Sequence, residues 1–130
     1  MRFGCMHEVS VVSDLVAAIL KELEAHEVTG VDEVTLIVGE LTNLGSEQME
    51  FAYGVVTRGT VLEGSKITII PEAIKVECLS CEYVGPVKFI VDDDFGHGSI
   101  PILSCPSCGG RVRVVEGRTC RVGNIRAVMA

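Results

Sequence analysis

The sequence predicts an α+β fold in which two helices pack on a small sheet of about three strands, with a cysteine-rich insert in the chain. Amphipathic segments alternate with runs rich in β-branched residues, and these indicate the helices and the sheet. Two close pairs of cysteines mark the insert. A chain of 130 residues that is 48% hydrophobic is long enough for one compact domain with such a satellite.

The first helix is predicted over residues 9–25. Its apolar positions recur at intervals of three and four residues, which places them on one helical face. They are Val9, Val12, Val16, Ile19 and Leu23. Ser10 is the expected N-cap, and Gly30 is expected to follow the end of the helix.

The remaining elements follow from local pattern. Residues 33–40 predict a strand. A second helix begins at Ser46, with acids in its first turn and Arg58 near its end, and its apolar face is formed by Met49, Ala52, Tyr53 and Val56. The run 66–77 and the segment after residue 111 predict further strands, of which the last returns to the first sheet. Residues 1–77 and 112–130 are therefore assigned to an α/β domain, and residues 78–111 to an inserted module.

Composition and charge exclude several classes of function. With 18 acidic and 11 basic residues the net charge is −7, and no basic cluster is present that would neutralise nucleic-acid phosphates. No signal peptide and no apolar run of about 18 residues is found, so a cytoplasmic protein without a membrane span is expected. No Ser-His-Asp order or phosphate-binding glycine loop is recognised, so an enzyme is not expected.

The paired cysteines are the most specific motif. Cys78 and Cys81 form one C-x2-C pair, and Cys105 and Cys108 form a second pair after 23 intervening residues. Two such pairs supply four thiolates in a tetrahedral shell, which suits Zn²⁺ and leaves no open position for substrate. A structural zinc in a ribbon-like module is predicted; rubredoxin-like iron and metal-free buried cysteines are the alternatives.

Two further cysteines lie outside this pattern. Cys120 falls in a strand-like run and is expected to be a small buried hydrophobe. Cys5 lies near the N-terminus, where it is either an incidental residue or a spare soft ligand.

Met6, His7 and Glu8 form a second candidate metal site. If Met6 is the first residue, its α-amine, the amide nitrogen of His7 and the imidazole can chelate one ion. Such nitrogen-rich sets favour Ni²⁺ or Cu²⁺. Glu8 would add an oxygen ligand or neutralise charge near the helix N-terminus. The alternative is an ordinary solvated histidine near a chain end.

The chain resembles the HypA/HybF family of hydrogenase nickel-incorporation proteins over residues 6 to about 128. The matching motifs are MHEVSVVSDLV from Met6, VGELTNL at 38–44 with the EFAY helix, ITIIPEAIKVECLSC, CPSCGG and the strand ending in NIRAV. This resemblance implies a nickel metallochaperone that carries a structural zinc. It also implies two partners, the GTPase HypB and the large-subunit precursor of [NiFe] hydrogenase, with urease as a further client in some relatives.

Carried onto this sequence, the resemblance assigns zinc to the four paired cysteines and nickel to His7, supported by Met6 and Glu8. His97, between two glycines, is a further candidate nickel ligand or a solvated loop residue. The motif normally opens the chain, whereas here MRFGC precedes it, so residues 1–5 are expected to be a non-native or disordered extension. A monomer or weak dimer is expected. The alternative function is a structural zinc-ribbon interaction module without metal transfer.

Overall fold

A computed structural model describes residues 3–91 and 99–129, and for residues 3–6, 91 and 99 it describes the backbone alone. The described residues form two compact units. The first, called the helical unit here, is drawn from residues 1–38, 43–70 and 120–130. The second, called the cysteine unit, is drawn from residues 39–42 and 71–119.

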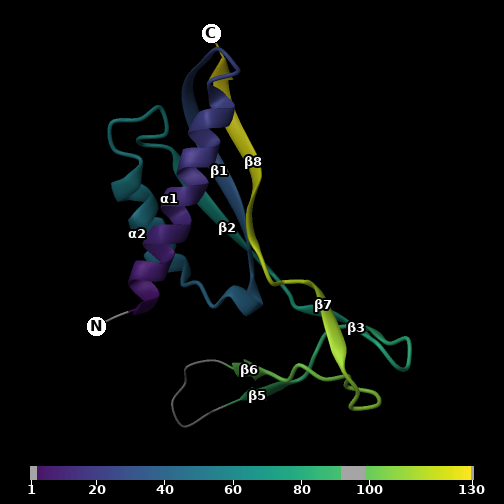
Figure 1. Cartoon of the computed structure of the whole chain (residues 1–130). Coiled ribbons are helices and arrows are strands. Elements are labelled where there is room, and N and C mark those ends of the chain that lie inside the picture. The colour runs from purple at the N-terminus through teal and green to yellow at the C-terminus, as the bar shows by residue number, and fades with distance from the viewer. Residues whose placement is uncertain (1–2, 92–98, 130) are drawn as a thin grey trace. The chain divides into compact units, whose positions relative to one another are not determined.

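The helical unit packs two helices on a three-stranded sheet of order β2-β1-β8, which confirms the predicted fold class (Figure 1). Its elements are α1 (Phe3–Leu23), β1 (Val28–Gly39), α2 (Ser46–Val56), β2 (Lys66–Glu72) and β8 (Cys120–Met129). A short 3-10 helix, η1 (Glu40–Thr42), follows β1. The C-terminal strand β8 returns to the first sheet, as the sequence predicts, and there it pairs antiparallel with β1.

Helix α1 differs from its prediction at both ends. It begins at Phe3, so Ser10 is an exposed position within the helix and not an N-cap. It ends at Leu23, and Gly30 lies inside β1. The predicted apolar face was also misplaced at its start, because Val9 is 43% exposed whereas Glu8 is buried. Among the described side chains, the buried seam begins with the carboxylate of Glu8, which a search for apolar residues does not detect.

The buried core of the helical unit is mainly aliphatic, with Tyr53 as its aromatic member. It combines the α1 seam, the inward side of β1, the predicted face of α2 and Leu62. From β1 these are Val31, Val34, Leu36 and Val38. The step of three residues from Val31 to Val34 breaks the alternation of a regular strand, and a register shift between Val31 and Glu33 restores both valines to the same face. None of the described helices is long and apolar enough to cross a membrane.

The cysteine unit contains a three-stranded sheet of order β4-β3-β7 and a separate two-stranded sheet. Its strands are β3 (Lys75–Cys78), β4 (Val84–Gly85), β5 (Phe89–Val91), β6 (Ser99–Pro101) and β7 (Val112–Glu116). The unit includes more residues than the predicted module of 78–111. The reason is that β3, which leads into the first cysteine pair, is paired with β7, which follows the second.

Candidate metal centres

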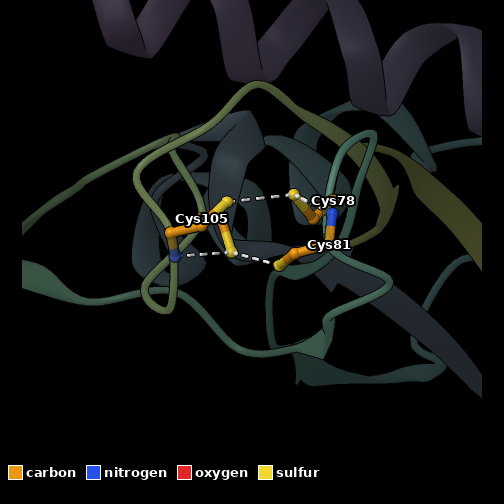
Figure 2. Close-up of side chains that lie close together, drawn as sticks. Cys78, Cys81 and Cys105 are labelled. Carbon is orange, nitrogen blue, oxygen red and sulfur yellow. Dashed lines mark hydrogen bonds between the residues drawn. The ribbon is translucent and has the colours of Figure 1, made fainter.

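The four paired cysteines lie together, as their spacing predicts. Their sulfur atoms are all within 4.8 Å of one another. Cys78 Sγ is 3.6 Å from Cys108 Sγ, and Cys81 Sγ is 3.5 Å from Cys105 Sγ. Figure 2 shows the labelled thiols of Cys78, Cys81 and Cys105 facing a common centre. Four thiolates at about 2.3 Å from a tetrahedral zinc are about 3.8 Å apart, so the arrangement fits such an ion.

The two cysteine pairs have the same local backbone. In the first, Cys78 Sγ accepts hydrogen bonds from the N–H groups two and three residues later, at 3.3 and 3.4 Å. In the second, Cys105 Sγ accepts the equivalent two bonds, each at 3.4 Å. The residue after each pair has a positive φ, 66° at Glu82 and 76° at Gly109. Each turn therefore aims two sulfurs at one point and offers N–H groups to thiolate charge.

Thiol crowding and N–H donation separate the acidities of the cysteines. Burial raises the pKa of Cys105, but N–H donation, chiefly from Cys108, outweighs burial and lowers the pKa to about 6. The N–H of Tyr83 lowers the pKa of Cys81, but the neighbouring thiols outweigh it and raise the pKa to about 12. Without a metal, the four thiols therefore do not all ionise together, whereas a bound dication would stabilise all four thiolates.

The GEL motif at residues 39–41, which starts with the last residue of β1, belongs to the cysteine unit. Gly39 N–H donates to Thr119 O at 2.9 Å, and a Cβ at Gly39 would lie 2.2 Å from the Gly117 backbone. Glu40 Oε1 accepts a hydrogen bond from Ile74 N–H at 3.1 Å. Leu41 packs against the small apolar cluster of Ile74, Val76 and Val87. In this protein the motif therefore has a structural role, which sequence reasoning did not assign.

His7 and Glu8 lie on different sides of α1. His7 is exposed, whereas Glu8 is 3% exposed and its Oε2 accepts a hydrogen bond of 2.5 Å from Gly45 N–H. The structure thus separates the imidazole from the carboxylate expected to assist it. Sequence reasoning missed the role of Gly45. Positions 8, 12, 16, 19 and 23 are spaced along a helix as the predicted apolar positions are, and this spacing could have placed Glu8 on the buried face.

Other candidate ligands fall partly or wholly outside the described residues. His97 lies in the 92–98 segment, and the side chains of Cys5 and Met6 are likewise outside the description. Cys120 is half-buried and packs against the helical core, in agreement with its predicted role as a small hydrophobe.

Comparison with known families bears on what these centres are for. A family model described as "Hydrogenase/urease nickel incorporation, metallochaperone, hypA" matches residues 6–127. The chain belongs to this HypA family. Its motifs at Met6-His7-Glu8, at GEL and at both cysteine pairs all lie within the matched range, and the family acts in hydrogenase maturation.

Individual HypA relatives match along almost their whole length. The hydrogenase maturation factor HypA of Methanothermobacter thermautotrophicus is 37% identical over 122 residues, which is 93% of this chain and 96% of the relative. That of Methanocaldococcus jannaschii is 34% identical over 125 residues, covering 92% and 94%. The solution structure of the Ni metallochaperone HypA from Helicobacter pylori shares the fold, with a TM-score of 0.66 at 18% identity over 95% of this chain and 98% of that one.

Proposed function

We propose that this protein binds Ni²⁺ through His7 and delivers it to the large-subunit precursor of [NiFe] hydrogenase. The observation that carries this proposal is the exposed imidazole near the start of α1, in the unit that does not contain the cysteine cluster. An exchangeable ion needs an accessible donor, and His7 offers one. Family membership supports nickel as the ion.

We also propose that the four paired cysteines hold a structural Zn²⁺. Four sulfur donors close the coordination shell, so the ion would have no position for water or substrate. When bound, zinc would crosslink the two cysteine turns; the residues themselves supply the turn geometry and the N–H groups that stabilise thiolate charge. This division keeps the resident metal in one unit and the transported metal in the other.

The helix start determines which nitrogen atoms can join His7 as nickel ligands. Because α1 begins at Phe3, the N–H of His7 falls within the regular α-helical hydrogen-bond pattern. In a chain that starts at Met6, the N–H of His7 would be among the first four of the helix, which have no intrahelical acceptor. That shorter chain would also supply an α-amine with a pKa of about 7.7–8.0. Both changes favour a nitrogen-rich site.

The family's role in hydrogenase maturation implies protein partners. We propose that these partners are the GTPase HypB and the hydrogenase precursor. We also propose that the protein meets them in the cytoplasm as a monomer or weak dimer. The net charge of −7 suits metal cations and proteins with basic surfaces better than nucleic acid.

The proposed function is tested by isothermal titration of Ni²⁺ into two forms of the chain, starting at Met1 and at Met6. The Met6 form is expected to bind at least about tenfold more tightly, with a square-planar absorption spectrum, since a free amine and an unpaired amide replace helix-bonded nitrogens. His7→Ala in the Met6 form should abolish this binding. Equal affinity in the two forms would show that the amine is not a ligand, and equal affinity in His7→Ala would overturn the proposed site.

A further inference from the structure

Glu8 occupies a position in α1 where an apolar residue is usual. Its side chain is 3% exposed, and it precedes Val12 and Val16 at four-residue intervals on the buried seam of the helix. A carboxylate is costly to bury without partners, so its contacts should explain its presence there.

The contact is with the start of α2. Gly45 is the N-cap residue of α2 and has no side chain to cap the helix, and its N–H donates to Glu8 Oε2 at 2.5 Å. The carboxylate also lies where the α2 dipole is positive, which favours an anion. Figure 1 shows that both helices begin at the same end of the pair. A residue of one helix therefore caps the other.

The described side chains leave a hollow at this end of the helix pair. A cavity of about 410 Å³ lies beside the contact and is lined by Val9, Glu47, Gln48 and Phe51. Val9 is 43% exposed and Phe51 75% exposed, so neither closes the gap. Among the side chains of α1 that the structure describes, from His7 onward, the first fully buried apolar one is Val12, one turn beyond Glu8. Among the described side chains, the hydrogen bond from Gly45 links Glu8 directly to the first turn of α2.

This contact is incompatible with a ligand role for Glu8 beside His7 in the described conformation. Successive helical residues point about 100° apart, and His7 faces solvent while Glu8 faces the interior. The second oxygen, Oε1, is buried without a hydrogen-bond partner among the described residues. To reach a metal at His7, the carboxylate would have to leave the core and abandon the N–H of Gly45.

We propose that Glu8 is a positioning residue that latches the His7-bearing turn of α1 to the N-terminus of α2, and that it is not a nickel ligand. The latch itself is a property of the metal-free protein. Its effect on nickel rests on the proposed function of His7. Glutamine can preserve the latch, because its amide oxygen accepts the same N–H, but it cannot supply a carboxylate to a metal.

The test compares Glu8→Ala and Glu8→Gln in the full chain, with Asp14→Asn as a matched control at an exposed position of the same helix. Without metal, Glu8→Ala should lower the melting temperature of the helical unit by at least about 5 °C and speed hydrogen exchange at the Gly45 amide. Glu8→Gln should recover more than half of that loss, and Asp14→Asn should change neither quantity.

Nickel titration of the same variants separates positioning from coordination. Glu8→Ala should weaken nickel binding, because the turn that carries His7 is no longer held in place. Glu8→Gln should bind nickel within about threefold of the parent chain, because glutamine keeps the latch and no metal ligand is lost. A loss of more than about tenfold in Glu8→Gln would overturn the proposal, as would unchanged metal-free stability in Glu8→Ala. If His7→Ala bound nickel normally, the proposed function would fail, and the latch would be judged on the metal-free measurements alone.

Discussion

The two units of this protein are stabilised in different ways. The helical unit has a continuous aliphatic core contributed by both helices and β1. In the cysteine unit the corresponding cluster has three buried members, Ile74, Val76 and Val87. A core of that size is small for ordering a loop-rich segment, so we expect the cysteine unit, and not the helical unit, to depend on a metal crosslink for its fold. Under the proposed function, this difference would let one chain hold one metal permanently and release another.

Removal of the resident metal should give the largest effect. Cys105→Ser, or a strong chelator, is expected to unfold the cysteine unit while the helical unit stays folded, because structural zinc supplies roughly 10–16 kcal/mol in small zinc domains. Residue-resolved NMR would show collapsed dispersion for β3 and β7 with the α1 and α2 signals retained. Cys120→Ser is the matched control, since this thiol lies outside the cluster. Loss of both units together would contradict the comparison.

The smallest expected effect distinguishes the two cysteine turns. A methyl group at Gly109 would meet no atom within 4 Å, so Gly109→Ala tests backbone strain alone and should cost about 1 kcal/mol at its φ of 76°. Glu82→Gly, at the equivalent position with a φ of 66°, should change stability by no more than about 0.5 kcal/mol, because relief of strain is offset by greater freedom of the unfolded chain.

The stability of both variants is measured by thermal unfolding of the cysteine unit with its metal bound. If Gly109→Ala left the stability of the cysteine unit unchanged, the backbone at residue 109 would have relaxed out of the left-handed region. The hydrogen bonds to sulfur would then not fix the two turns equally.

Sequence reasoning recovered the parts of the structure that depend on local pattern. The Cys-x2-Cys pairs determine the sulfur cluster, because the two intervening residues limit where each thiol can point. The face of α2 formed by Met49, Ala52 and Tyr53 was likewise predicted and is buried. The return of the C-terminal run to the first sheet was also predicted, and β8 lies in that sheet beside β1.

The features that sequence reasoning missed depend on contacts between distant residues. The start of α1 was placed too late, because a carboxylate on the buried seam is acceptable only when Gly45, 37 residues away, donates to it. The structural role of Gly39 depends on the close approach of Gly117, which no local pattern reveals. The strand β7 joins the cysteine unit through its pairing with β3, and pairing partners cannot be deduced from propensity alone.

The measurement that most directly tests the separation of the two metals is a nickel titration of the zinc-loaded chain that starts at Met6, with both metals quantified after gel filtration. The account predicts uptake of about one Ni²⁺ per chain with no release of zinc, and no nickel uptake in His7→Ala with its zinc intact. Nickel uptake matched by an equal loss of zinc would show that the cysteine cluster takes up the nickel. That result would contradict the assignment of the two metals to different units, and nickel uptake retained in His7→Ala would contradict the assignment of nickel to His7.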